Sequence, residues 1–398
     1  MPEYERQLNQ LDDYYASLLK RDVLPAELIH DYSKWGIERY EGWAPEIEWI
    51  IKDVLPVTPG LIASMGGVGK SFLMLDAAVR IAAGPGAFGQ WAMGGKVMQQ
   101  GKVLMVTAED NKNAVHRRLN SIMSPDQHKK LKGNLFIVPL PDAGGTRPLL
   151  ECVGGQYVMT AAWDDFCNNV IKMGILCSFM DPWQAVAAVD ANDPAAGQCY
   201  WSSISQLCAE TKSAHLTSHH MRKQENIDGI ASARAAIRGS SALVDGSRLS
   251  YALWPATHDD RLMTEQLLGT PLGPLDLVSG AVVKSNDFGM SDVATYVRDR
   301  VSGLLIDCSE QLAEQFQEAN TLPSGAMHET SLEATVRWDR GQPFSKAPQS
   351  DRWIGAWVMH QFKCPRSVAV KYVKEWVMRG ELVQEWCKEI RSNGLRGR

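Results

Sequence analysis

The chain has 398 residues, of which 45% are hydrophobic and 22% are charged, and its formal net charge is −5 at pH 7. This length predicts two or three domains with enough apolar side chains for packed cores. The mild negative charge argues against a protein coated in basic surface, although a positive groove can lie inside an acidic shell.

The cysteines and the start of the chain bear on the cell compartment. None of the eight cysteines belongs to a Cys-x-x-Cys pair, so we expect buried thiols in a reducing compartment, with neither a disulfide frame nor a zinc site. The start is charged and polar, without a signal peptide, and no apolar run approaches membrane-spanning length. These features predict a cytoplasmic protein with no membrane contact.

The predicted elements begin with a short helical N-terminal segment over residues 1–50, because Tyr, Leu and charged residues recur at helical spacing in 3–19 and 25–35. From 51 to 308, apolar strands alternate with helices, which is typical of an α/β domain with a mostly parallel sheet. The expected strands are 61–63, 102–107, 135–138, 175–180, 215–218, 247–254 and 278–284. The expected helices are 72–78, 116–122, 163–173 and 198–212.

The last part of the chain is predicted to be a separate small domain. Residues 309–349 lose periodicity and are rich in Pro, Gly and Ser, so we expect a linker. Residues 350–398 follow a helix, turn, helix, strand pattern, which predicts a winged-helix-like domain. Its helices are expected at 351–361 and 366–378, and its strand at 381–386.

This tail domain is basic. Residues 363–398 contain nine Lys and Arg against four Glu, on an otherwise acidic chain. Arg366, Lys371 and Lys374 are therefore candidates for contacts between a recognition helix and duplex DNA. A winged helix that contacts protein, or a solvated helix, is the alternative.

The run from Met65 to Ser71 has the pattern of a phosphate-binding loop between a strand and a helix. Its backbone N–H groups can close around phosphate oxygens at the positive N-terminus of the helix. Lys70 reaches the terminal phosphates and Ser71 can hold Mg²⁺, so ATP and Mg²⁺ are the predicted cofactors. The usual pattern begins with Gly, and here that place is Ser64. The expected cofactor-binding residues are Gly66, Gly67, Val68, Gly69, Lys70 and Ser71.

Hydrolysis also needs a metal-side carboxylate and a group that activates water. Asp181 follows an apolar strand and is the candidate for Mg²⁺; its alternative role is a turn residue before Pro182. Glu109 follows another strand and can polarise the attacking water, or it can belong to a helix-capping turn with Asp110. His219 and His220 end a further strand, where one of them can sense the γ-phosphate. Each is otherwise a structural histidine.

Several short motifs keep a fixed order between residues 55 and 290. After the loop come Ala108-Glu109-Asp110, Asp181-Pro182, His219-His220-Met221-Arg222-Lys223, Arg-Gly-Ser-Ser-Ala-Leu-Val-Asp over 238–245, and Lys284-Ser285-Asn286. In these motifs the chain resembles the RepA-type hexameric replicative helicases of plasmids and their phage relatives. The resemblance implies a RecA-like P-loop NTPase core in a hexameric ring. It also implies that Arg238 is an arginine finger on the neighbour's nucleotide, with Lys284 as a weaker second trans contact.

Two loops can face the channel of such a ring. Residues 187–197 are small and acidic, which suits phosphate contacts poorly and leaves a mobile surface loop as an even alternative. Residues 222–234 offer Arg222, Lys223 and Arg234 to the phosphates of single-stranded DNA. Neither loop contains an aromatic residue, so base stacking is not supported.

The sequence as a whole predicts an ATP-hydrolysing, ring-forming DNA translocase, a replicative-type DNA helicase of a plasmid, phage or mobile element. Two other classes stay open. One is a DNA-binding replication initiator or regulator in which ATP only switches assembly. The other is a RecA-like recombination ATPase that forms filaments.

Overall fold

The structure is a computed structural model that describes residues 32–86, 88, 90–222, 227–237, 241–289, 292–312, 322–362, 364 and 366–398 (side chains of 241, 242, 366 and 367 excepted). The chain divides into two units, Met1–Ile47 and Glu48–Arg398. In the first unit, the described residues form two 3₁₀ helices, η1 (Tyr32–Trp35) and η2 (Ile37–Tyr40). The helix expected at 3–19, and most of that at 25–35, lie outside the described residues.

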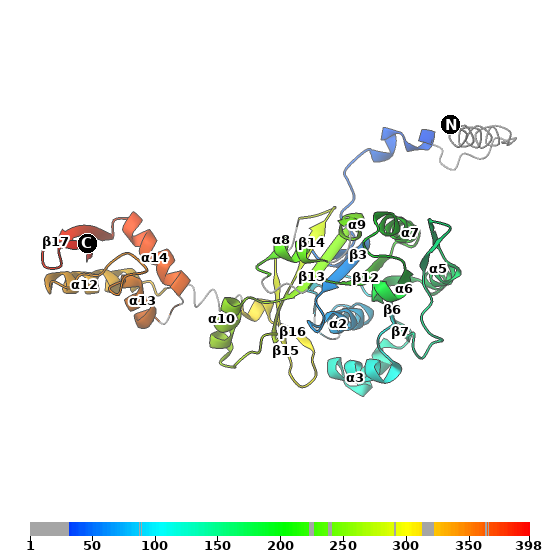
Figure 1. Ribbon diagram of the computed structural model, residues 1–398, viewed down its shortest axis with the longest axis horizontal. Coiled ribbons are helices and arrows are strands. Elements are labelled where there is room, and N and C mark those ends of the chain that lie inside the picture. The colour runs from blue at the N-terminus through cyan, green and yellow to red at the C-terminus, as the bar shows by residue number, and fades with distance from the viewer. Residues whose placement is uncertain are drawn as a thin grey trace, which may run out of the picture. The chain divides into compact units, whose positions relative to one another are not determined.

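A nine-stranded sheet organises the second unit, in the order β16-β15-β14-β13-β3-β12-β10-β6-β7 (Figure 1). The six strands from β13 to β7 pair in parallel, and β14, β15 and β16 continue the sheet in antiparallel fashion. Their bounds are β3 (Pro59–Ser64), β6 (Lys102–Thr107), β7 (Leu135–Pro139), β10 (Ile175–Asp181), β12 (Ala214–His220), β13 (Leu249–Pro255), β14 (Leu277–Ser285), β15 (Ala294–Arg298) and β16 (Leu305–Asp307).

Helices cover both faces of this sheet, and the strand side chains alternate between two apolar clusters. On β3, Ile62 packs with α2 in one cluster, whereas Leu61 and Ala63 pack with α5 and α7 in the other. The helices are α2 (Lys70–Ala83), α3 (Lys112–Ile122), α4 (Pro125–His128), η3 (Lys129–Leu131), α5 (Ala161–Met173), α6 (Trp183–Val186), α7 (Pro194–Thr211), α8 (Ile230–Ala236), α9 (Ser241–Gly246) and α10 (His258–Leu268). The predicted α/β class with a mostly parallel sheet around a phosphate loop is confirmed.

Short strands complete the unit outside the main sheet. They are β1 (Trp49–Ile51) with β2 (Leu55–Pro56), β4 (Trp91–Ala92) with β5 (Gly95–Lys96), and the set β8 (Leu150–Val153), β9 (Gln156–Met159) and β11 (Ala187–Ala188). β11 occupies the start of the predicted acidic loop, where it pairs in parallel with β8.

Two helices begin earlier than expected because polar residues cap their N-termini. The side chain of Asp193 accepts a bond from Ala195 N at 2.8 Å, and Pro194 occupies the first turn, so α7 starts four residues before 198. Asn111 caps α3 through a 2.9 Å bond from Ala114 N, which starts that helix at Lys112.

The C-terminal part corrects the expected linker. A helix, α12 (Ala326–Asp339), lies within 309–349 and contacts the last strand of the chain. Its packing face is made of small residues, so Ser331 lies against Gly397 and donates its hydroxyl to Arg398 O at 3.2 Å. That face carries little hydrophobic periodicity, which is why the pattern indicated no helix.

The remaining C-terminal elements follow the expected order. They are α13 (Ile354–Phe362), α14 (Arg366–Met378), β17 (Leu382–Cys387) and β18 (Ser392–Gly397), with β17 and β18 paired as a hairpin. One apolar cluster joins them to α12, from Leu322 to Leu395. Two helices and a hairpin agree with the predicted pattern, and the winged-helix assignment stays a prediction. Within the described residues, no helix is both long and apolar enough to span a membrane.

Candidate nucleotide site

The phosphate loop, residues 65–69 with the first turn of α2, joins the central strand β3 to α2. Gly67 and Gly69 have φ angles of +79° and +114°, a region that side chains strongly disfavour. A Cβ atom at Gly69 would also lie 2.9 Å from Leu305 Cδ1. The departure at Ser64 is accommodated, because this buried hydroxyl donates to Met65 O at 3.0 Å.

A buried polar network lies directly behind the loop. Lys70 Nζ is 2.6 Å from Asp181 Oδ1 and donates to Ser218 Oγ at 2.6 Å. The second carboxylate oxygen, Asp181 Oδ2, accepts a 2.6 Å bond from Ser71 Oγ, and Ser218 donates to Oδ1. Burial alone would raise the pKa of Asp181, but the Lys70 ammonium and the two hydroxyls outweigh it and hold that pKa below its usual value. The carboxylate therefore stays ionised.

These residues fit a nucleotide phosphate chain with Mg²⁺. The loop glycines let backbone N–H groups point at phosphate oxygens, and the N-terminus of α2 favours negative charge. Ser71 and Asp181 offer hydroxyl and carboxylate oxygens, which are the ligands Mg²⁺ prefers, at 2.6 Å from each other. The structure thus brings the predicted phosphate residues and the predicted metal residues together.

Glu109 and Asp110 form the turn after β6, beside this network. Ala108 N donates to Asp181 O at 2.8 Å, which joins the turn to the end of β10. Glu109 is exposed, whereas Asp110 is half-buried and forms an ion pair with Arg118 of α3. Burial raises the pKa of Asp110, opposed by Arg118 and reinforced by the charges of Asp181 and Glu109. The N-cap of α3 is Asn111, so neither acidic residue is its cap.

The two histidines end β12 next to β3, with His220 opposite Ser64 and His219 opposite Ala63. His219 is buried; its Nδ1 lies 2.8 Å from Gln184 Nε2, and its ring meets Trp183 edge-on at 6.0 Å. These contacts are those of a structural histidine. His220 is half-buried at the strand end nearest the loop. Sensing of the γ-phosphate by either residue stays a prediction.

Arg238 lies outside the described residues, but the helix after it is described. Lys284 of β14 donates to the backbone carbonyls of Val244 at 3.0 Å, Asp245 at 2.7 Å and Ser247, at the C-terminal end of α9. Burial lowers the pKa of Lys284. Within one chain, Lys284 thus fixes the helix that follows Arg238. Its expected contact across a subunit interface is not tested by these bonds.

The predicted DNA contacts fall in three places. Arg222 is exposed, and its backbone N–H donates to Ala236 O at 2.7 Å. Arg234 on α8 pairs with Asp245 of α9 at 3.1 Å, while Lys223 lies outside the described residues. On α14, Lys371 and Lys374 are exposed, and the side chain of Arg366 is not described. Their roles in DNA binding stay predictions.

Three residues near the loop were not expected from the sequence. Ser218 completes the Lys70 network. Arg118 lies over the ring of Phe72 at 5.3 Å as well as pairing with Asp110. Arg298, on β15, donates to Val68 O at 2.5 Å and Gly67 O at 3.1 Å. No local motif marks them, because each reaches the loop from a distant strand or helix.

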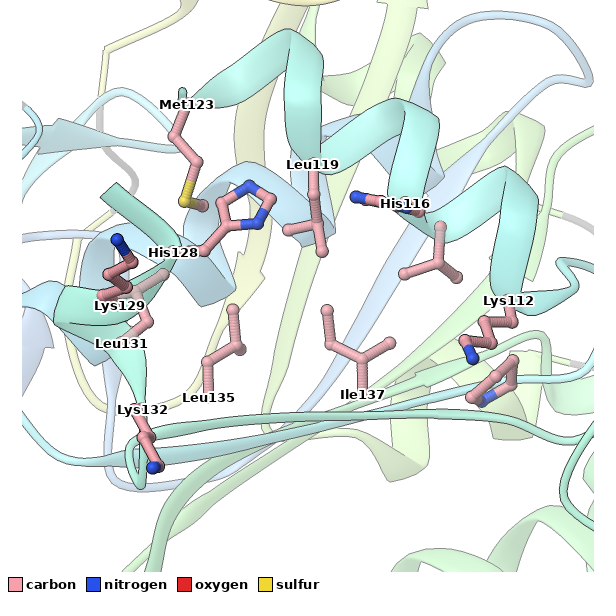
Figure 2. Close-up of a pocket in the computed structure, with 12 residues that line it drawn as sticks. Lys112, His116, Leu119, Met123, His128, Lys129, Leu131, Lys132, Leu135 and Ile137 are labelled. Atoms are coloured by element: carbon pink, nitrogen blue, oxygen red, sulfur yellow. The ribbon is translucent and has the colours of Figure 1, made fainter. Parts of the chain in front are cut away.

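A separate hollow of about 660 Å³ lies between α3 and β7, at one edge of the sheet (Figure 2). Figure 2 shows Leu119 on α3 facing Leu135 and Ile137 on β7 across this space. No residue of the phosphate loop lines it, so it is not part of the nucleotide site.

The fold and the loop define a P-loop nucleotide-binding protein. The sequence matches the family model described as AAA domain over residues 27–226, half of the chain, and the protein belongs to this AAA domain family of ATPases. Among solved structures, the chain is similar to one whose title describes it as the ATPase domain of another protein. The TM-score is 0.40 and the identity 13%, with 63% of this chain and 84% of that chain covered.

Proposed function

We propose that the protein is a replicative-type DNA helicase of a plasmid, phage or other mobile element. It hydrolyses ATP between the subunits of a hexameric ring and moves along single-stranded DNA in the central channel. The observation that carries the nucleotide part is the Lys70, Asp181, Ser71 and Ser218 network behind a complete phosphate loop. The order of motifs from the loop to Lys284 supports the helicase part.

Each step of hydrolysis then has a residue. Lys70 binds the terminal phosphates, while Ser71 and Asp181 hold Mg²⁺, which neutralises charge on the phosphate oxygens. Glu109 is exposed beside Asp181 and orients the attacking water as its base. Arg238 of the neighbouring subunit stabilises the charge that develops on the transferred phosphoryl group, which couples turnover to closure of the interface.

The DNA contacts follow from the same arrangement. Arg222, Lys223 and Arg234 contact phosphates of the single strand, and α14 binds duplex DNA through Arg366, Lys371 and Lys374. The ion pair of Arg234 with Asp245 leaves Arg222 as the more available cation of the two described loop residues. Binding through phosphates makes the affinity salt-dependent and insensitive to base sequence.

The exposed lysines of α14 favour a second candidate, a DNA-binding initiator or regulator in which ATP switches assembly. A strand-displacement assay decides between the two. A forked duplex with a labelled strand is incubated with the protein, ATP and Mg²⁺, with the Lys70→Ala variant as control. Displacement by the natural protein alone supports the helicase. Sequence-selective duplex binding that survives Lys70→Ala, without displacement, supports the initiator.

A further inference from the structure

Arg298 joins the far end of the sheet to the back of the phosphate loop in the same chain. It is the last residue of β15, and one of its guanidinium nitrogens, Nη2, donates to both Val68 O at 2.5 Å and Gly67 O at 3.1 Å. Its Nε donates to Leu275 O at 3.0 Å, which fixes the direction of the planar group. The guanidinium is half-buried, so these bonds are partly shielded from water.

The two accepting carbonyls determine where the loop N–H groups point. In a trans peptide the C=O and the N–H of one plane point in opposite directions. The carbonyl of Gly67 shares its plane with the N–H of Val68, and the carbonyl of Val68 shares its plane with the N–H of Gly69. Because both carbonyls are held toward Arg298, both N–H groups are turned away from it. The Val68 N–H makes only a long 3.4 Å contact, with Met65 O.

The turn beyond Arg298 supports the same face of the loop. Leu305 of β16 lies against Gly69, and Gly303 lies beneath the ring of Phe72. Asp299 holds the turn itself, since its backbone carbonyl accepts from Gly303 N at 2.7 Å. The hairpin of β15 and β16 is therefore a rigid support on which the loop rests.

We propose that Arg298 is a positioning residue for the triphosphate: it holds the Gly67 and Val68 carbonyls outward, so that the Val68 and Gly69 N–H groups are preset for phosphate oxygens. The proposal rests on the proposed ATPase activity. The loop is then ordered before nucleotide arrives, and binding does not have to supply the cost of ordering it. A group that acts equally on ground and transition states changes KM more than kcat.

The test compares three variants of the full-length protein. Arg298→Ala removes the guanidinium, and Arg298→Lys keeps the charge but loses the fork that fixes two directions. Arg300→Ala is the matched control, because Arg300 lies two residues away and bonds Asp276 and Pro271 O. For each, KM and kcat for ATP are measured, with inhibition constants for ADP and AMP and the melting temperature.

We expect Arg298→Ala to raise the KM for ATP and the inhibition constant of ADP at least ~10-fold, about 1.4 kcal/mol. The value for AMP should stay within ~2-fold, since AMP lacks the phosphates that the loop N–H groups bind. Arg298→Lys should fall in between, and Arg300→Ala should match the natural protein. If Arg298→Ala does not fold, the Lys variant gives the same comparison.

Three results would overturn the inference. ATP and ADP affinities unchanged in folded Arg298→Ala would mean that the loop is ordered without this residue. An equal loss for ATP, ADP and AMP would show general damage to the site. A loss in kcat alone would place Arg298 in the chemical step. If the natural protein neither binds nor hydrolyses ATP, the proposed function itself fails, which is a separate outcome.

Discussion

At the scale of single residues, the Lys70 and Asp181 pair ties stability to the nucleotide site. Asp181 is almost fully buried and its pKa lies below the usual value, so the native state favours its ionised form. A carboxyl whose pKa is lowered on folding stabilises the native state above its unfolded pKa, about 3.9. That contribution is lost as the pH falls through the lower native value.

Lys70→Ala should therefore abolish ATP hydrolysis and also weaken the fold at neutral pH. Removing the ammonium leaves a buried carboxylate without its cation, which costs about 3 kcal/mol. In urea unfolding at several pH values, the difference from the natural protein should shrink below about pH 4, where protonation removes the uncompensated charge. The control is Lys52→Ala, whose exposed pair with Asp53 at 3.5 Å should matter little. A pH-independent difference would contradict this account of Asp181.

Glu109→Gln should keep ATP binding and lose turnover. The carboxylate is exposed in the turn beside Asp181, so the amide can replace it without disturbing packing. A lost general base typically lowers kcat by ~10²–10⁴-fold with little change in nucleotide affinity. Single-turnover hydrolysis and ATP titration measure the two quantities. Affinity that collapses together with the rate would make Glu109 structural, and Asp110 would then be the better candidate.

The sequence predicted the part of the site that lies in contiguous motifs. Lys70 and Ser71 belong to one loop, and Asp181 follows a strand whose apolar run is unmistakable. Ser218 and Arg298 were missed because their roles depend on strand order. Ser218 meets Asp181 only because β12 pairs with β10, and Arg298 meets the loop only through the antiparallel extension of the sheet. No spacing within a single sequence encodes such neighbours.

At the scale of elements, Lys284 stabilises α9 by bonding its last carbonyls, where a positive charge also suits the helix dipole. Lys284→Ala should loosen α9 and the finger segment before it, at a cost of about 1–3 kcal/mol for lost charge-assisted bonds. ATP affinity should persist, because Lys284 does not touch the phosphate loop. Turnover should fall severalfold. Hydrogen exchange of α9 amides measures the loosening directly.

Lys102→Ala is the matched control for this experiment. Lys102 is an exposed lysine that also bonds the C-terminal carbonyl of a helix, Met173 O at 2.9 Å, far from the predicted finger in sequence. Its loss should loosen α5 without slowing hydrolysis. Equal effects of both variants on turnover would mean that α9 has no special part in the reaction.

Element boundaries were predicted less well than element types. The predicted strands of the main sheet all occur, because runs buried on both faces are strongly apolar. The ends of α3 and α7 were missed because their capping residues, Asn111 and Asp193, look like loop residues in sequence. The helix α12 was missed because it packs through small side chains, which give no apolar stripe.

At the scale of the whole molecule, the C-terminal apolar cluster sets where the chain can be cut. Leu322 and Phe344 pack in the same cluster as Leu395, so residues 322–398 form one cooperative unit. A chain ending at 321 should stay soluble and keep its ATPase activity, whereas one ending at 349 should expose α12 and aggregate. Light scattering and dye binding to apolar surface measure this. Equal behaviour of the two truncations would contradict the assignment of α12 to this unit.

The ring mechanism predicts that Arg238 acts on a neighbouring subunit. Arg238→Ala should bind ATP and assemble but turn over slowly, since a finger typically contributes ~10³–10⁵ in rate. Mixed with Lys70→Ala subunits, it should recover activity that neither variant has. Some interfaces then combine an intact loop from one variant with an intact finger from the other. Absence of recovery in verified mixed oligomers would mean that Arg238 acts within its own chain or not at all.

The empty nucleotide site satisfies its own charges, and this bears on how fast nucleotide is exchanged. When product leaves, Lys70 can return to Asp181 and Ser71 to the same carboxylate, so release exposes no isolated buried charge. When ATP enters, the same pair has to separate, which makes binding weaker than the phosphate contacts alone would give. A site built in this way gives up affinity for rapid exchange, which suits a motor that must discard ADP at every step.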